Sequence, residues 1–140
     1  MSMLSVSDLF SKRLLLLVSL VVIGGGASLA KSFDIHGQIV IGLEHMVGGD
    51  WAMHLIVATT LGFFASWATP KSYYQYSSIP FSPWVGLLLV AVSIDEFSQM
   101  YLPLRQFSWT DLGINLSGVL MGSVVYMFYI SCRYPSYLRW

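Results

Sequence analysis

The chain has few charged residues: seven basic and seven acidic side chains make up 10% of its 140 residues and leave no formal net charge. A nucleic-acid surface needs an excess of basic residues, so this balance argues against a nucleic-acid partner. Cysteine occurs once, at Cys132, which excludes an internal disulfide and a metal site built from several cysteines. Hydrophobic residues make up 56% of the chain. This composition is typical of a membrane protein, and the length fits a single domain over residues 1–140.

Apolar segments predict an all-α membrane protein with four transmembrane helices. About 20 residues are needed to span the hydrocarbon core as a helix. Segment 14–30 also resembles a signal peptide with a small-residue cleavage site, but we expect it to be retained because the topology is then more consistent. In the last segment, Gly118 and Gly122 have the spacing that lets a neighbouring helix approach closely. The predicted spans are 14–30, 50–69, 84–102 and 111–131.

The connections between the spans and their charges predict the topology. We expect residues 31–49 to form an extramembrane or interfacial loop, with a short interfacial helix as the alternative. Residues 71–83 are expected to form a second interfacial loop. Because basic residues concentrate on the cytoplasmic side of membrane proteins, their distribution predicts that both termini are cytoplasmic. The basic residues assigned to that side are Lys12, Arg13, Lys71, Arg133 and Arg139.

Polar residues gather where three predicted helices meet the outer side. Each of these helix ends carries two polar residues one turn apart, so each helix can direct a polar stripe toward a common centre. We expect one outward-opening pocket, with Asp50 and Asp111 also capping their helices. The candidate catalytic residues are His54, Asp95 and Glu96, and the candidate substrate-binding residues are Asp50, Gln99, Arg105, Asp111 and Asn115.

These polar residues follow a fixed order along the chain. The order is Asp50-x-x-x-His54, Asp95-Glu96-x-x-Gln99, Pro103-x-Arg105, Ser108-x-x-Asp111 and Asn115-x-x-Gly118, followed by Gly122. The pattern, over residues from about 50 to 122, resembles the VanZ-like family of bacterial integral membrane proteins. It departs from the family at Trp51, where a lysine commonly follows the first aspartate. The resemblance implies a multi-pass plasma-membrane protein of the cell envelope whose molecular activity is unsettled.

Two classes of function fit the predicted pocket best. The first, which we favour, is an accessory protein acting at the outer leaflet on cell-envelope or lipid-linked components. In this class Arg105 pairs with neighbouring acids, and the exposed faces contact membrane lipids, a membrane-protein partner or a second copy of the chain. The alternative is a membrane enzyme in which Arg105 binds a lipid-linked anionic ligand and His54 or a carboxylate serves as acid or base.

A metal-binding protein is a third class. A divalent ion accepts the ligand types offered by Asp50, His54, Glu96 and Asp111, but the sequence has no compact metal signature. We therefore expect no metal and no cofactor. The number of acids still requires an explanation, because Arg105 alone cannot neutralise the carboxylates predicted beside it. Either some of these acids are protonated, or water, His54 or a ligand completes the set, and such a surplus marks a candidate functional site.

Overall fold

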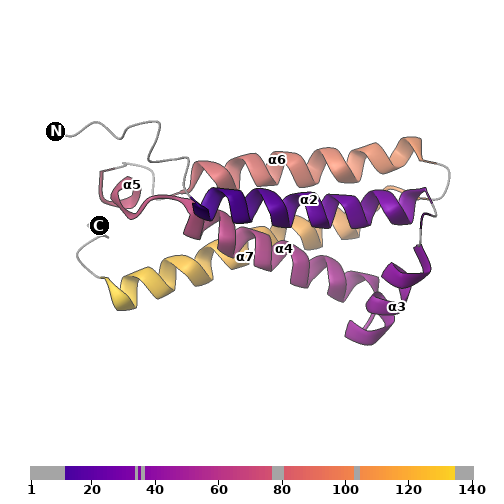
Figure 1. Cartoon of the computed structure of the whole chain (residues 1–140), viewed down its shortest axis with the longest axis horizontal. Coiled ribbons are helices and arrows are strands. Elements are labelled where there is room, and N and C mark those ends of the chain that lie inside the picture. The colour runs from indigo at the N-terminus through magenta and orange to yellow at the C-terminus, as the bar shows by residue number, and fades with distance from the viewer. Residues whose placement is uncertain (1–11, 34, 36, 77–80, 103–104, 135–140) are drawn as a thin grey trace.

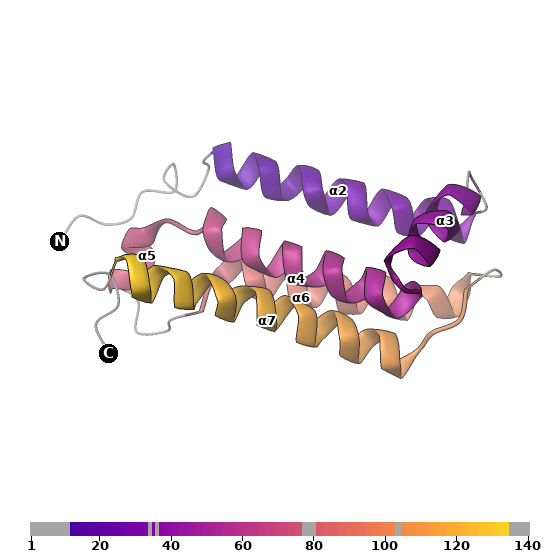
Figure 2. The same ribbon diagram turned by 90° about the horizontal axis from the view of Figure 1, so that it is seen from below.

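The computed structural model is all-α, as the sequence predicts (Figure 1). It describes residues 12–33, 35, 37–76, 81–102 and 105–134. The elements are α2 (Lys12–Ser32), α3 (Gly37–Val47), α4 (Asp50–Ala68), α5 (Lys71–Tyr76), α6 (Pro83–Ser98), the 3-10 helix η1 (Gln99–Tyr101) and α7 (Trp109–Arg133). The four long helices run along a common direction, and the short helices α3 and α5 lie at opposite ends of the molecule (Figures 1 and 2).

Three of the helices, α2, α4 and α7, are long and apolar enough to cross a membrane. Helix α6 is apolar as well, but it has 16 residues, fewer than the about 20 of a typical span. It begins where the Ser82 hydroxyl accepts hydrogen bonds from the backbone N–H groups of Trp84 and Val85. The chain thus contains several candidate membrane spans, and the fourth span stays a prediction.

Two segments predicted as loops contain helices. The loop prediction is wrong over Gly37–Val47, where the alternative of a short helix is what forms, and over Lys71–Tyr76. Gly48 and Gly49 end the first of these helices. Their φ angles are 107° and 112°, a backbone region that side chains with a Cβ rarely adopt. The turn between α3 and α4 therefore depends on these two glycines.

The predicted aspartate caps do not form. The N-cap of α4 is Gly49 without a side-chain cap, so Asp50 is already the first helical residue. Helix α7 begins at Trp109 because the Ser108 hydroxyl accepts a hydrogen bond from the Asp111 backbone N–H at 3.2 Å. Both prediction errors have the same consequence: the carboxylates of Asp50 and Asp111 are left for contacts outside their own helix ends.

Helices α4 and α7 pack closely along their length. A Cβ atom added at Gly118 would lie 2.8 Å from the Ala58 Cβ, and one at Gly122 would overlap the carbonyl oxygen of Thr59. On the other helix, a Cβ at Gly62 would overlap the Val119 carbonyl. The predicted close approach at Gly118 and Gly122 is confirmed, and α4 supplies a third glycine to the same contact.

Helix α5 is fixed to the end of α4 by buried polar contacts. The Tyr74 hydroxyl donates to the Ser66 carbonyl oxygen at 2.9 Å. Burial raises the pKa of Tyr74 to about 12, so the hydroxyl stays protonated and remains a donor at physiological pH. At the same end of the molecule, Arg13 donates to the Trp67 carbonyl oxygen and its guanidinium lies 4.9 Å from the Trp67 ring centre. The polar residues predicted to form a site meet at the opposite end of the molecule, beside α3.

Candidate functional site

A cavity of about 390 Å³ lies between α2, α3, α4, α6 and the beginning of α7. Most of its wall consists of aliphatic and small side chains from α2, α4 and α6. Its polar residues come from the ends of the helices nearest α3, so the cavity has one polar end and a long apolar part. The polar lining residues are Ser28, Lys31, Glu44, Asp50, His54, Asp95, Arg105 and Asn115.

Lys31 is the central cation of the polar end. Its Nζ lies 2.6 Å from Glu44 Oε1 and 2.9 Å from Asp50 Oδ1. The Lys31 side chain is 20% exposed and that of Glu44 is 11% exposed, so solvent weakens this ion pair much less than one at the surface. The three residues come from three helices, α2, α3 and α4. The ion pairs therefore hold α2 and α3 against the start of α4.

Sequence reasoning missed Lys31 and Glu44 because it assigned both to a loop. Continuing α2 by one turn would have found Lys31, since Ser28 and Lys31 are three residues apart and share a helix face. Lys31 also bears on the position of Trp51, where the VanZ-like pattern commonly has a lysine. This chain has no lysine directly after Asp50, but a cation from another helix reaches the same carboxylate.

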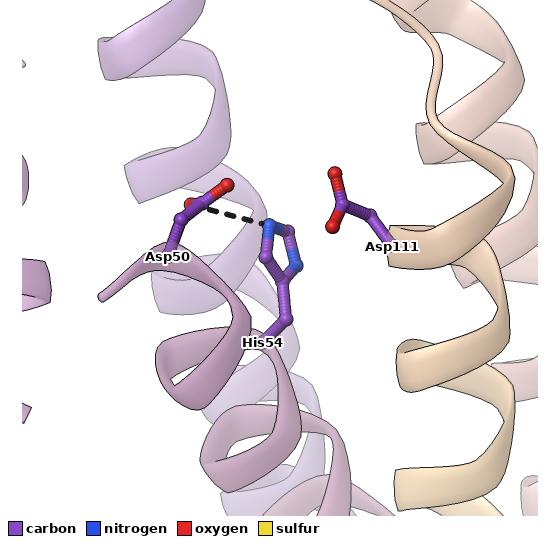
Figure 3. Close-up of side chains that lie close together, drawn as sticks. All are labelled: Asp50, His54 and Asp111. Atoms are coloured by element: carbon purple, nitrogen blue, oxygen red, sulfur yellow. Dashed lines mark ion pairs between the residues drawn. The ribbon is translucent and has the colours of Figure 1, made fainter. Parts of the chain in front are cut away.

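His54 lies between polar partners on two helices. Its Nε2 is 3.4 Å from Asp50 Oδ1, one turn earlier on α4. Its Nδ1 is 3.2 Å from Asn115 Oδ1 on α7. Asp111 faces the imidazole from the first turn of α7 (Figure 3). The side chains of Asp50, His54 and Asp111 are all half-buried, and one ligand atom from each of them lies within 4.8 Å of the others.

Asp95 and Arg105 complete the polar end. Asp95 Oδ2 accepts a hydrogen bond from the Ser28 hydroxyl at 3.2 Å, which joins α6 to α2. Arg105 follows η1 and lines the cavity, and within the described part of the chain it forms no ion pair. Among the described residues the guanidinium thus forms no ion pair with the carboxylates that line the cavity, and it lies near enough to Glu96 for the two charges to attract.

Glu96 and Gln99 are not among the residues that line the cavity. The Glu96 side chain is fully buried, and it accepts hydrogen bonds from the Ser108 backbone N–H at 3.1 Å and from Gln99 Nε2 at 3.3 Å. These bonds tie the end of α6 to the residue that caps α7. In this position Glu96 shapes the turn that carries Arg105, and the structure gives neither Glu96 nor Gln99 a contact with the cavity.

The fold and site define a helical membrane protein with several apolar spans and a cavity that is charged at one end. The chain belongs to the VanZ/LLP1 family, whose sequence profile matches residues 5–130. The match extends well beyond the motif between residues 50 and 122, and it includes the helix that contributes Lys31. Comparisons with curated proteins and with solved structures found no match.

Proposed function

We propose that the protein binds an anionic lipid-linked compound at the outer leaflet of the bacterial plasma membrane, as an accessory protein of the cell envelope. The observation that carries the proposal is the cavity itself, because it combines a charged end that contains Arg105 with an apolar remainder, as a compound with a charged headgroup and an apolar chain requires. Arg105 is the residue that we expect to bind the headgroup at the charged end of the cavity. It has no ion-pair partner among the described residues, and its planar fork can bind two oxygens of one phosphate or carboxylate.

The apolar part of the cavity continues along the molecule. A second groove of about 200 Å³ runs between α2 and α6 and is lined by hydrophobic residues alone. It shares Val21, Leu88 and Ala91 with the cavity, so the two form one track. Between Lys31 and Leu14, α2 rises by roughly 25 Å at 1.5 Å per residue. That length is close to the hydrocarbon thickness of about 30 Å, which suits a chain lying along the track.

We also infer that α6 is a fourth span and that the cavity opens on the outer side. Helix α6 and η1 together rise by roughly 30 Å, which is enough for the hydrocarbon core. Arg13, Lys71 and Arg133 belong to the end of the molecule away from α3, as a cytoplasmic end requires. Lys31 and Arg105 are the described basic residues of the other end, and both line the cavity.

Cysteine labelling in intact cells tests this orientation. With Cys132 replaced by serine, Gln38→Cys on α3 should react with a membrane-impermeant maleimide, while Ser72→Cys on α5 should react only after the cells are permeabilised. The reason is that α3 and α5 lie at opposite ends of the molecule (Figure 1). The reverse pattern would show that the termini are outside, and labelling of both in intact cells would contradict the four-span arrangement.

Arg105→Lys tests the lipid proposal in the protein reconstituted in nanodiscs. The probe is a photoactivatable phosphatidic acid, compared with a diacylglycerol that has the same chains and no phosphate. Wild-type protein should crosslink the phosphatidic acid preferentially, at Val21 and Leu88. Arg105→Lys should weaken this binding at least tenfold, because an ammonium group cannot form the two parallel hydrogen bonds of a guanidinium.

Arg133→Lys is the matched control, since it makes the same substitution in the last turn of α7, far from the cavity. It should bind phosphatidic acid as the wild type does. Equal crosslinking of the two lipids, or equal effects of the two lysine substitutions, would contradict headgroup recognition by Arg105.

A further inference from the structure

We propose that Asp50, His54 and Asp111 bind one divalent transition-metal ion, and that this ion joins the anionic headgroup to the protein. The second half of the proposal rests on the proposed lipid function, whereas the metal site does not. The candidate ligands are one imidazole nitrogen and two carboxylate oxygens. Zn²⁺ and Mn²⁺ accept this combination, while Ca²⁺ and Mg²⁺ prefer oxygen ligands alone.

The distances between the candidate ligand atoms suit a common ion. Two ligands that lie about 2.1 Å from a tetrahedral metal ion are roughly 3.4 Å apart. The distance between His54 Nε2 and Asp50 Oδ1 is 3.4 Å. Asp111 comes from the facing helix (Figure 3), and one of its carboxylate oxygens lies within 4.8 Å of a ligand atom of each of the other two residues. The Asp111 side chain would have to move by up to about 1.4 Å to reach the separation of a tetrahedral coordination shell.

The hydrogen bond of the other imidazole nitrogen supports metal binding independently. The Asn115 amide oxygen lies 3.2 Å from Nδ1. In the tautomer whose Nδ1–H donates to that oxygen, Nε2 presents a lone pair toward the Asp50 carboxylate, which is the arrangement that a metal ion between the two requires. Metal-binding histidines commonly donate their second ring nitrogen to an oxygen in this way.

The charge balance of the polar end also calls for a cation. Among the described residues it contains the carboxylates of Glu44, Asp50 and Asp95, with that of Asp111 beside them, and only Lys31 and Arg105 as fixed cations. Lys31 is already shared between Glu44 and Asp50. An anionic headgroup entering this end would meet a surplus of negative charge. A divalent ion removes that surplus and gives a phosphate a positive partner beside Arg105.

Zinc binding to the metal-stripped full chain in nanodiscs tests the site. Inductively coupled plasma mass spectrometry should find one Zn²⁺ per wild-type chain, and X-ray absorption should show one imidazole with oxygen ligands. His54→Gln and Asp111→Asn should each lower the affinity at least tenfold. Both replacements are similar in size to the native side chain, and circular dichroism checks that each variant is folded. His45→Gln, an exposed histidine on α3, should bind as the wild type does.

The outcomes separate the metal site from the lipid function. Substoichiometric zinc, or equal affinities in all four proteins, would overturn the metal site whatever the lipid result. In a second measurement, removal of zinc should weaken binding of the photoactivatable phosphatidic acid at least tenfold. If zinc binds but its removal leaves lipid binding unchanged, the bridging role is overturned. If zinc binds and phosphatidic acid is never preferred over diacylglycerol, the proposed lipid function and the bridging role both fail while the metal site stands.

Discussion

Replacing Gly122 by alanine is expected to remove most of the folded protein from the membrane fraction. The added Cβ would overlap the Thr59 carbonyl oxygen and lie 2.7 Å from the Phe63 backbone nitrogen. Both obstacles are main-chain atoms of α4, so no side-chain rotation relieves the overlap and the two helices must separate. We expect a loss of roughly 3 kcal/mol in the free energy of unfolding, at the upper end of what overpacking usually costs.

Gly113→Ala is the matched control because it makes the same substitution in the first turns of α7. A Cβ at Gly113 would meet no atom within 4 Å. Since alanine favours a helix over glycine by about 1 kcal/mol, this variant should be as abundant as the wild type or more so. The measurement is protein level in the membrane fraction together with the thermal unfolding temperature in detergent. If Gly122→Ala unfolds at the wild-type temperature, the close contact between α4 and α7 is wrong.

The fold was largely predictable because its signals are local. Apolar length identifies helices, and the four-residue spacing of Gly118 and Gly122 identified the tight helix contact. Gly62 could not be recognised in the same way, since it is a single glycine in α4. It takes part in the tight contact only because the packing places it against the Val119 backbone of α7. The predictions failed at the helix ends. At the starts of α4 and α7 the N-cap residues are Gly49 and Ser108, and not the nearby aspartates, because Gly49 and Ser108 occupy the positions where the chain enters each helix.

The candidate site was predictable where it depends on helix geometry. One-turn spacing placed Asp50 with His54 and Asp111 with Asn115, and the structure brings these pairs together across α4 and α7. Lys31 and Glu44 could not be placed in the same way. Their contact depends on how α3 packs against α2, and the contact of Lys31 with Asp50 depends on the turn from α3 into α4 at two glycines with positive φ; both are tertiary features. Glu96 was placed in the site because of its position in the motif, but that position did not reveal that its carboxylate accepts a hydrogen bond from the backbone N–H of Ser108, the N-cap residue of α7.

Replacing Lys31 by methionine is expected to destabilise the protein by about 3 kcal/mol. Methionine keeps the length of the side chain and removes the charge. Glu44, whose side chain is 11% exposed, would then be a negative charge without its cation in a poorly solvated place. Asp50 should suffer less because its side chain is 45% exposed. The expected loss lies at the lower end of the about 3 to 5 kcal/mol that breaking a buried ion pair costs, since Lys31 is itself 20% exposed.

A double variant distinguishes this charge effect from a loss of packing. Lys31→Met combined with Glu44→Gln should recover more than half of the lost stability, because the second substitution neutralises the carboxylate that the first one leaves unpaired. Lys12→Met, at the exposed end of the same helix, should change the unfolding free energy by no more than about 0.5 kcal/mol. The measurement is thermal unfolding of the three variants and the wild type in the same detergent. If the double variant is no more stable than Lys31→Met alone, then the unpaired charge of Glu44 is not what destabilises Lys31→Met, and the ion pair with Glu44 contributes little to the fold.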